Sequence, residues 1–429
     1  MVGIYCFILM VALMLLSVPV IPAMGLASMA TLAMTRGGFK LVSVSLGTIN
    51  ALNSFTLLAL PMFLFTGKLM NEGGITTRIF NFARKIVGWM PGGMAMVNIF
   101  SSMVFGGMSG TSTADAGGLG AIEIKAMREN GYDDEFTGSV TAASAILSPL
   151  IPPSLNVVIY VSITGASIMG MFMSGLCSGI AWALVMMVMV QVYANLRHYA
   201  KDPLPKLREV WAAFKEAFLS LLAPVILLVG IYSGVFTATE AAAIVVVYCT
   251  ALTTVVYRLV DLRRLWAIFK DTAMDVAIIG GVLAVATMFG QVIVRTKLPQ
   301  ELVGLIVANV SSRSVFLLLI VLLIVFLGML MDGAVITVIV TPMLLGLLEA
   351  FDISLVHYGI LQLVALTLGA LTPPYGMTTF ITARILDMPM LKLAKAMIPW
   401  MIGLLIFTFT VAFFPGFVTW LPKLMGYAT

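Results

Sequence analysis

The chain has 429 residues, of which 61% are hydrophobic and only 10% are charged, with a formal net charge of +5. These values exclude an ordinary soluble domain. Apolar runs such as 171–192 and 219–236 approach or reach the roughly 20 residues that a helical membrane span needs, so we expect an all-α polytopic membrane protein.

The first half of the chain is expected to form five membrane spans and one re-entrant helical hairpin. The spans are predicted at 3–20, 21–34, 51–70, 136–163 and 170–196, and the hairpin at 92–127. The first run lacks a basic leader and a small-residue cleavage site, which favours a span over a removed signal. Segment 68–93 alternates polar and apolar residues at helical spacing, which predicts an interfacial amphipathic helix. An ordinary charged loop is the alternative interpretation.

The tip of the first hairpin, "GGMSGTSTADAGGLG" at 106–120, combines glycines with hydroxyl side chains. Irregular backbone is tolerated at membrane depth only where it is buried in protein or lines a wet cavity. Its carbonyls and the hydroxyls of Ser109, Thr111 and Ser112 are hard oxygen ligands of the kind that Na⁺ uses, and helix N-termini there can face an anion. Close helix packing through small residues is the alternative interpretation.

The next span carries three prolines in "ILSPLIPPSLN", residues 146–156, and proline breaks a helix. The longest polar stretch then follows at residues 195–215, and we expect residues 197–217 to be a cytoplasmic amphipathic linker. The second half, 218–429, is predicted to repeat the first. Its spans are expected at 218–236, 238–257, 272–294, 355–383 and 394–414, and its hairpin at 314–350.

One fixed offset of 221 positions relates the two halves. It places Gly107-Met108 on Gly328-Met329 and Pro152-Pro153 on Pro373-Pro374. Because five crossings per half is an odd number, the second half must start on the opposite side of the membrane, as in the inverted repeats of secondary transporters. With the N-terminus outside, 18 of the 24 basic residues fall on the inner side, which agrees with the bias of cytoplasmic loops. The basic residues at the inner interface face anionic lipid, so the net positive charge does not require binding to nucleic acid.

Two charged residues of the second half are candidate site residues. Arg295 follows the third span, where its guanidinium suits a bidentate carboxylate, although it could instead extend to the outer interface. Asp332 aligns with Thr111 in the second hairpin tip, and a carboxylate inside a membrane segment predicts a functional site. Capping of the helix after it is the alternative.

The second broken span contains "TLGALTPPYGMTTF", residues 367–380, at the position that matches the first break. Corresponding Pro/Gly interruptions in two halves are a pointer to a transport site. The free carbonyls of each break need a partner, so two breaks and two hairpin tips predict two cation sites related by a pseudo-twofold axis.

Other chemistries are poorly supported. Cys6, Cys177 and Cys249 show no pairing pattern, and His198 and His357 have no companion at ligand spacing, so we expect no disulfide framework and no transition-metal site. The sequence contains no Walker A motif, which excludes ATP hydrolysis by this chain.

The combination of "GMSGTSTADAGGLG", "ILSPLIPPSLNVVIY", "GASIMGMFMSG" and "LTPPYGMTTFI" resembles the large membrane subunit of tripartite ATP-independent periplasmic (TRAP) transporters, in the ion transporter superfamily. The resemblance covers essentially the whole chain. It implies Na⁺-driven uptake of an organic acid, sialic acid or a C4-dicarboxylate, by an elevator mechanism in the bacterial inner membrane. It also implies a soluble periplasmic binding protein and a small four-helix membrane subunit, which is expected to be a separate chain because this one begins directly at the first span.

The resemblance also implies site residues. One Na⁺ site is expected among Ser109, Gly110, Thr111, Ser112, Ser148 and Pro149. A second is expected among Gly328, Asp332, Thr372, Pro373 and Met377. Substrate is expected near Ser109, Thr111, Asn156, Ser167, Arg295 and Asp332.

Three alternatives remain open at this stage. The first is a stand-alone Na⁺/dicarboxylate or citrate symporter of the same superfamily, which would need no binding protein. The second is a membrane scaffold or channel subunit with no substrate of its own. The third is a polytopic enzyme, against which the scarcity of His, Cys and clustered carboxylates argues.

Overall fold

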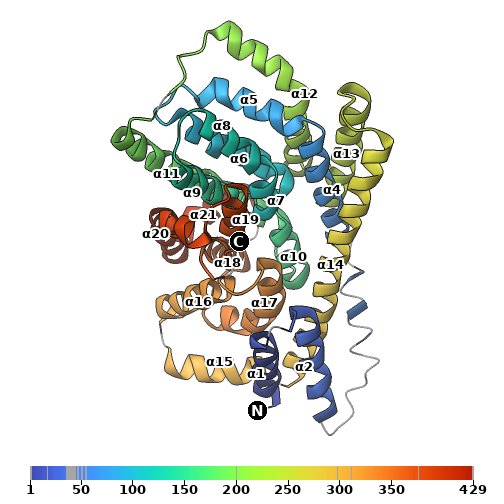
Figure 1. Ribbon diagram of the computed structural model, residues 1–429. Coiled ribbons are helices and arrows are strands. Elements are labelled where there is room, and N and C mark those ends of the chain that lie inside the picture. The colour runs from blue at the N-terminus through green and yellow to red at the C-terminus, as the bar shows by residue number, and fades with distance from the viewer. Residues whose placement is uncertain are drawn as a thin grey trace.

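The computed structural model describes residues 2–16, 18–34, 45, 48–49, 52–53, 56–199, 201–296, 298–310, 312–374 and 376–427. Within these residues every regular element is helical, as expected from the composition (Figure 1). Three of the basic residues used to predict the topology, Arg36, Lys40 and Lys297, lie outside the described residues.

The N-terminal helices are α1 (Val2–Leu15), α2 (Val20–Met34), the short 3₁₀ turn η1 (Thr56–Leu58), α4 (Ala59–Glu72) and α5 (Ile75–Val87). Helix α5 is amphipathic, because Ile75, Ile79 and Ala83 recur at helical spacing on its buried side. On its polar side Arg84 forms two hydrogen bonds with Asp202, at 2.7 and 3.0 Å. The Arg84 guanidinium holds the pKa of the Asp202 carboxyl below its ordinary value, so α5 is tied to the polar stretch that follows the first half.

The rest of the first half consists of α6 (Gly93–Ser109), α7 (Ser112–Gly117), α8 (Leu119–Glu129), α9 (Asp134–Ala145), α10 (Leu155–Thr164) and α11 (Ile168–Arg197). The hairpin tip lies between α6 and α7. The proline segment lies between α9 and α10, where the helix predicted at 136–163 is divided in two. We call these two segments tip 1 (residues 109–112) and break 1 (residues 146–154).

The second half consists of α12 (Leu207–Tyr232), α13 (Ala238–Ala251) with the π-helical turn η2 (Leu252–Val256), α14 (Leu262–Arg295), α15 (Leu298–Asn309), α16 (Arg313–Gly328), α17 (Gly333–Ala350), α18 (Leu355–Leu371), α19 (Met377–Ile385), α20 (Met390–Phe413) and α21 (Gly416–Leu424). Tip 2 (residues 329–332) lies between α16 and α17, and break 2 (residues 372–374 and 376) lies between α18 and α19. The Pro152-Pro153 and Pro373-Pro374 bonds in the two breaks are cis.

Several helices begin earlier than the apolar pattern predicted. Helix α12 begins at Leu207, inside the segment predicted as a linker, and α14 begins at Leu262 instead of 272. Asp261 caps α14, since its side chain accepts a hydrogen bond from the Arg264 amide. Hydropathy detects the apolar part of a helix and misses a polar first turn of this kind.

Helix boundaries recur at the same spacing as the sequence motifs. Helices α8 and α17 end at Glu129 and Ala350, and helices α10 and α19 end at Thr164 and Ile385. Helices α9 and α18 begin at Asp134 and Leu355. Each of these pairs is separated by 221 positions, so the correspondence extends from residue types to the elements that they form.

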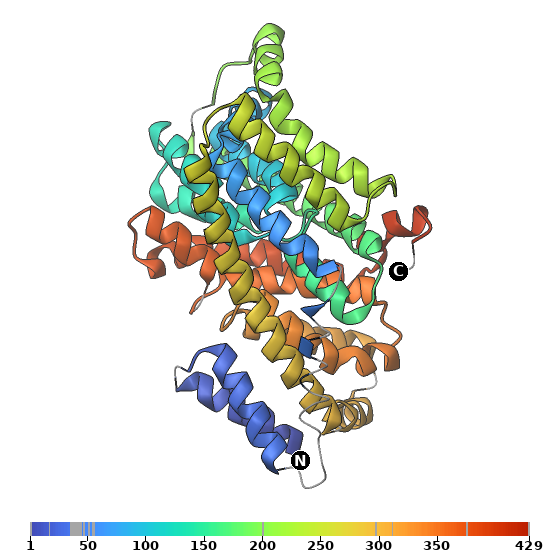
Figure 2. The ribbon, with the colours of Figure 1, turned by 90° about the vertical axis from the view of Figure 1, so that its right-hand side faces the viewer.

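The helices can be divided into two groups, which also pack against each other through α5 on α6 and through α14 on α17. In one group α14 packs against α2 and α4, α4 against α13, and α12 against α5 and α13. In the other group the two hairpins and the two broken helices interlock, with α7 against α19 and α10 against α17. The long α14 crosses one face of the molecule, as Figure 2 shows in yellow.

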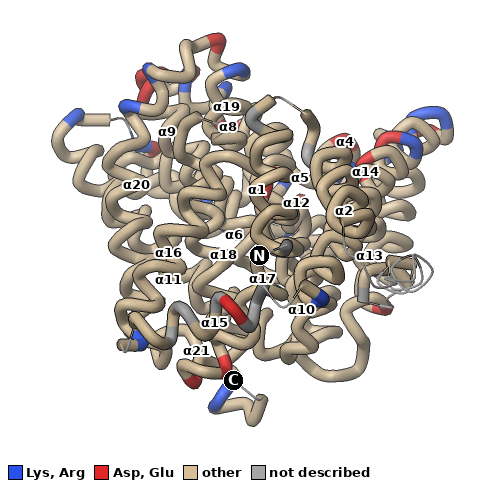
Figure 3. The backbone as a smooth tube through the Cα atoms, turned by 90° about the horizontal axis from the view of Figure 1, so that it is seen from below, with Lys and Arg blue, Asp and Glu red and all other residues tan. Residues whose placement is uncertain are grey.

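The charged positions lie mainly at the edges of the molecule. Figure 3 shows them around the ends of α8, α9 and α19 and beyond α4 and α14, with charge-poor helices between. Among the described residues, six helices are long and apolar enough to cross a membrane by length and composition: α11, α12, α13 with η2, α14, α17 and α20. A polytopic membrane protein is the architecture that these features support.

Candidate functional site

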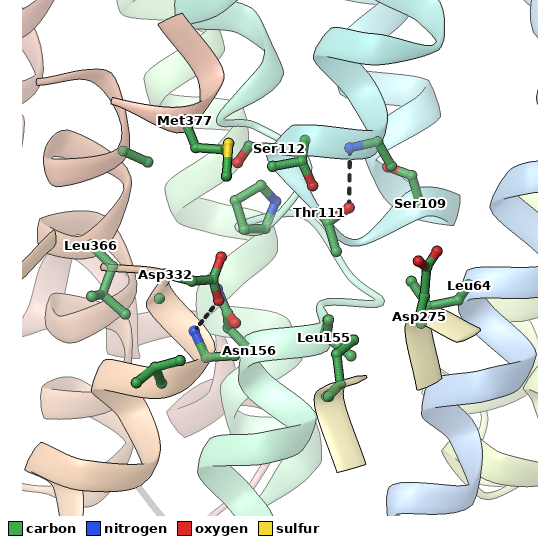
Figure 4. A pocket seen from close by; sticks show the side chains of 18 of the residues that line it. Leu64, Ser109, Thr111, Ser112, Leu155, Asn156, Asp275, Asp332, Leu366 and Met377 are labelled. Carbon is green, nitrogen blue, oxygen red and sulfur yellow. Dashed lines mark hydrogen bonds between the residues drawn. The ribbon is translucent and has the colours of Figure 1, made fainter. Parts of the chain in front are cut away.

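A cavity of about 670 Å³ lies between the two helix groups (Figure 4). One wall is formed by tip 1, tip 2 and the ends of the broken helices. The facing wall is formed by α4 and α14. Residues of both tips therefore meet around one space.

Tip 1 is held in place by its backbone. Helix α6 is followed by its C-cap residue Gly110, which has φ +64°. A Cβ atom at Gly110 would lie 2.7 Å from the Pro153 carbonyl oxygen, so only glycine permits this approach of tip 1 to break 1. The Leu155 amide also donates to the Gly110 carbonyl at 3.3 Å. The chain then turns into α7, where the Thr111 hydroxyl accepts a hydrogen bond from the Ala114 amide.

Tip 2 presents a carboxylate to the same cavity. Asp332 caps α17 by accepting a hydrogen bond from the Ala334 amide at 2.8 Å, and it also lines the cavity. Figure 4 shows its carboxylate beside the side chain of Asn156 on α10. A Cβ atom at Gly333 would lie 3.3 Å from the Asn156 amide nitrogen, so tip 2 and α10 are closely packed. Capping and exposure to the cavity, which were alternatives on the sequence, occur together at Asp332.

Most of the sequence-predicted residues lie at the cavity or directly behind it. The cavity is lined by Ser109, Thr111, Ser112, Pro149, Asn156, Gly328, Asp332 and Met377. Gly110, Ser148, Thr372 and Pro373 belong to the same tips and breaks but do not line it. The Ser148 hydroxyl donates to Asp115 at 2.8 Å, and the Thr372 hydroxyl donates to the Leu368 carbonyl at 2.7 Å.

Two predicted residues lie elsewhere. Ser167 caps α11, where its hydroxyl accepts a hydrogen bond from the Gly170 amide at 3.1 Å. Arg295 lines a second cavity of about 380 Å³ between α10, α14 and α17, together with Ser162 and Gln291. The two cavities share Leu283 on α14. The second cavity therefore adjoins the first at Leu283, whereas Arg295 lies further along α14, about 18 Å from Leu283 at the usual helical rise, and does not line the first cavity.

Sequence reasoning missed an ion pair on the facing wall. Lys68 on α4 and Asp275 on α14 both line the cavity, and their charged groups are 2.6 Å apart. Lys68 is one of the basic residues counted on the inner side and begins the segment predicted as an amphipathic helix, and Asp275 lies in the span predicted at 272–294. Lys68 ends the apolar run "LPMFLFTGK", and Asp275 directly precedes the apolar run "VAII", so a charge at the edge of an apolar segment was the available signal.

The chemistry of the lining suits small cations and organic acids. Ser109 is 3% exposed and its hydroxyl has no hydrogen-bond partner, although it lies at the cavity. Hydroxyl, carboxylate and backbone oxygens at the tips are a hard donor set that fits an alkali cation better than a transition metal. Among the described lining residues the charged groups are Lys68, Asp275 and Asp332, so one ammonium faces two carboxylates.

Comparison with known sequences gives consistent results. The family described as "Tripartite ATP-independent periplasmic transporter, DctM component" matches residues 7–417. The sialic acid TRAP transporter large permease protein SiaM of Vibrio cholerae is 42% identical over 380 residues, covering 88% of this chain and 89% of that protein. The C4-dicarboxylate large permease protein DctM of the same organism is 32% identical, covering 98% of this chain and 97% of that protein.

Two further similarities concern chain organisation and fold. The sialic acid permease protein SiaT of Haemophilus influenzae is 36% identical over 414 residues, covering 96% of this chain and 67% of that protein. Among solved structures, the Alcanivorax borkumensis YdaH transporter superimposes with a TM-score of 0.64 at 14% identity, covering 96% of this chain and 98% of that chain. At that identity the likeness concerns the fold alone.

Proposed function

The chain belongs to the DctM family of tripartite ATP-independent periplasmic transporters, and from this premise we propose that it carries an organic acid across the bacterial inner membrane. It would act as the large, multi-pass subunit. The observation that carries the proposal is the cavity between the two hairpin tips, because it joins oxygen donors for cations to a lysine for a carboxylate. Sialic acid is the first candidate substrate and a C4-dicarboxylate the second, in the order of the relatives' identities.

The substrate carboxylate would be bound by Lys68. Its present partner, Asp275, is about half exposed, so the ion pair can exchange for a carboxylate of the substrate at a modest cost. Polar groups of the substrate would contact Ser109, Thr111, Asn156 and Asp332 from the opposite wall. Arg295 would contact the substrate only in the neighbouring cavity, and Ser167 would support α11 from its N-cap position.

Uptake would be coupled to Na⁺. The first ion would be held at tip 1 and break 1, by Ser109, Gly110, Thr111, Ser112, Ser148 and Pro149. The second would be held at tip 2 and break 2, by Gly328, Asp332, Thr372, Pro373 and Met377. The unpartnered hydroxyl of Ser109 favours the first site, since a buried hydroxyl without a partner is costly. Bound cations would also neutralise the excess of carboxylates around the substrate.

Transport would use an inverted repeat and an elevator motion. The repeated helix boundaries support the repeat, with halves at 1–196 and 218–429. The group that contains the hairpins and broken helices would move with the substrate against the group that contains α4, α12, α13 and α14. The N-terminus of the chain would be periplasmic, and the basic stretch at 197–217 would be cytoplasmic, because cytoplasmic loops carry an excess of Lys and Arg.

The complete transporter would contain two further proteins. A soluble periplasmic protein would deliver the substrate, and a small four-helix membrane subunit on a separate chain would accompany this one. The name of the relative SiaM, a TRAP transporter large permease protein, supports the tripartite arrangement.

Reconstitution tests the proposal directly. This chain and the small subunit are reconstituted into liposomes, and the soluble binding protein is added outside. Uptake of labelled sialic acid or succinate is then measured with and without an inward Na⁺ gradient. We expect uptake only when all three proteins and Na⁺ are present. Uptake by this chain alone would replace the tripartite assignment with a stand-alone symporter, and absence of uptake for any organic acid that the binding protein binds would overturn the function.

A further inference from the structure

A third cavity, of about 500 Å³, lies at the base of the second hairpin. Its walls come from the start of α16, the end of α17, the start of α18 and helix α21, and α18 packs against both α16 and α21. The polar residues that line it are Arg313, Glu349, Asp352, Ser354, His357, Thr419 and Lys423. None of them lines the first or the second cavity, so the proposed transport site does not use them.

One buried side chain at this cavity lacks a partner. His357 is 1% exposed, and its Nε2 atom lies 2.8 Å from the Val411 carbonyl oxygen. Because a carbonyl can only accept a hydrogen bond, the Nε2 atom carries the hydrogen and the Nδ1 atom of the neutral ring is an acceptor. This Nδ1 atom is buried and has no hydrogen-bond partner. It is therefore the polar atom that His357 can offer to a ligand, and it suits a donor such as an ammonium or a hydroxyl group.

The cavity also carries charges of both signs that are not paired with each other. Arg313 and Lys423 supply two positive charges, and Glu349 and Asp352 supply two negative charges. All four side chains are exposed and thus accessible to a ligand. In the described part of the chain none of the four forms a salt bridge. Opposite charges that line one cavity without touching are complementary to a zwitterion, which can place its acidic end on the cations and its ammonium on the carboxylates.

The surface beside the cavity indicates that this zwitterion is the headgroup of a lipid. Large apolar side chains exposed on α16 and α21 are Val315, Leu319, Leu322, Phe417, Trp420 and Leu424. Helix α21 is amphipathic, since it buries Val418 and Thr419 while it exposes these apolar residues. Exposed aromatic side chains on such a helix are typical of the interface between membrane and water. A lipid can therefore lay its acyl chains along this surface while its headgroup enters the cavity.

We propose that the third cavity binds a zwitterionic phospholipid whose headgroup carries a phosphate and a primary ammonium, as in phosphatidylethanolamine. The phosphate lies against Arg313 and Lys423. The ammonium lies against Glu349, Asp352 and the Nδ1 atom of His357. A bound lipid joins the base of the second hairpin to α18 and α21, and so stabilises this part of the protein. That the lipid belongs to the outer leaflet rests on the proposed orientation of the chain, whereas binding of the headgroup does not.

Lipid binding by the purified full chain tests the site. The chain is delipidated in detergent, and binding of dioleoyl phosphatidylethanolamine is measured by native mass spectrometry and by the shift in melting temperature. We expect Arg313→Gln/Lys423→Gln to weaken binding by about tenfold or more, because both lost contacts are charge-assisted. The matched control is Arg263→Gln/Lys270→Gln, which removes the same residue types from exposed positions on α14 outside the three cavities.

The headgroup is identified by comparing lipids with the same acyl chains. Wild type should bind phosphatidylethanolamine more tightly than phosphatidylglycerol, because only the former carries an ammonium for the carboxylates of the cavity. Glu349→Gln/Asp352→Asn should lose this preference. No preference in wild type, or an unchanged preference in this variant, would show that the site does not recognise a zwitterion.

The remaining arms separate the lipid from a soluble ligand and the site from the rest of the surface. Glycerophosphoethanolamine has the same headgroup without acyl chains, and equal stabilisation by this probe would exclude the lipid as the occupant. Equal lipid binding by wild type and Arg313→Gln/Lys423→Gln, or an equal loss in the α14 control, would overturn the site. If the double variant does not fold, Arg313→Gln and Lys423→Gln are measured singly with the same meaning. No arm involves transport, so a failure of uptake and a failure of this inference are separate results.

Discussion

Lys68 is the basic side chain among the described residues that line the cavity, and its position changes the expected substrate contact. The sequence favoured Arg295 for this role because a guanidinium suits a carboxylate. The structure instead places Lys68 opposite the hairpin tips, paired with Asp275 at 2.6 Å. Because both side chains of this pair are partly exposed, the ammonium can exchange Asp275 for a carboxylate of the substrate.

We predict that Lys68→Met reduces substrate uptake at low concentration by roughly tenfold or more, because a charge-assisted contact contributes about 1.5–3 kcal/mol. Arg295→Ala is expected to reduce uptake less, since Arg295 lines only the neighbouring cavity. Uptake rates as a function of substrate concentration in proteoliposomes check both. The matched control is Lys85→Met, because Lys85 forms a salt bridge with Glu209 away from both cavities. A larger loss in Arg295→Ala than in Lys68→Met would restore the original assignment.

At the scale of elements, glycines allow the hairpin tips to rest on the helix breaks. A Cβ atom at Gly110 would lie 2.7 Å from the Pro153 carbonyl oxygen, and one at Gly369 would lie 2.5 Å from the Gly328 Cα atom. The first contact joins tip 1 to break 1, and the second joins α16 to α18 just before tip 2 and break 2. The two halves therefore use the same device, an approach of backbones without side chains between them, to position their oxygen atoms.

Two glycines with a similar backbone conformation allow the energy of this close contact to be measured apart from the cost of a left-handed conformation. Gly110 and Gly165 have φ of +64° and +69°, but a Cβ atom at Gly165 would meet nothing within 4 Å. We predict that Gly165→Ala lowers the free energy of unfolding by about 1 kcal/mol through the left-handed conformation alone. Gly110→Ala is expected to cost roughly 1–3 kcal/mol more, because overpacking is added.

Thermal unfolding of the purified variants, and their uptake in proteoliposomes, measure these effects. Gly110→Ala should also lose most of its transport, since tip 1 would be displaced from break 1, while Gly165→Ala should keep it. Equal melting temperatures and equal uptake for the two variants would show that the close contact between Gly110 and Pro153 contributes to neither stability nor transport.

Element positions were predictable to different extents. Apolar runs and proline pairs located the helices and both interruptions, because burial in lipid and loss of a backbone donor act locally. The starts of α12 and α14 were not predictable from hydropathy, since their first turns are polar and exposed. The salt bridge between Arg84 and Asp202, which ties α5 to the middle of the chain, depends on residues 118 positions apart and left no local signal.

At the scale of the whole molecule, the cavity lies at the boundary between the two helix groups, and the elevator proposal requires this boundary to slide. Gly67 on α4 meets Ser109 of tip 1 across it. A Cβ atom at Gly67 would lie 3.7 Å from the Ser109 Cβ atom, which is close to the mean of about 3.8 Å in disulfides. A cross-link at this position would connect the two groups.

We predict that the Gly67→Cys/Ser109→Cys variant forms this cross-link under mild oxidation and then loses uptake, and that a reductant restores the uptake to the level of the Ser109→Cys single variant, which lacks the Ser109 hydroxyl. The reason is that a covalent bond prevents movement of tip 1 relative to α4. The native Cys6, Cys177 and Cys249 are replaced by alanine in the background, so that a single disulfide can form. Uptake is measured on the same sample before and after reduction.

The single variants Gly67→Cys and Ser109→Cys, oxidised in the same way, are the controls for the substitutions themselves. Because the oxidised and reduced samples contain the same side chains, their difference reports the cross-link alone. Full uptake by the cross-linked protein would contradict relative movement of the two groups at this point.

The sequence by itself determined the helical membrane class, the family, the two interrupted spans and most of the residues around the cavity. Those features depend on local composition and on motifs that recur at an offset of 221 positions. Only the tertiary structure decided which charges face the cavity. It brought Lys68 and Asp275 to the wall opposite the tips, moved Ser167 and Arg295 away from it, and brought Arg313 and Lys423 together at the third cavity. The physical reason is that a side chain's partners across helices depend on how the helices rotate and pack, which spacing along one chain does not specify.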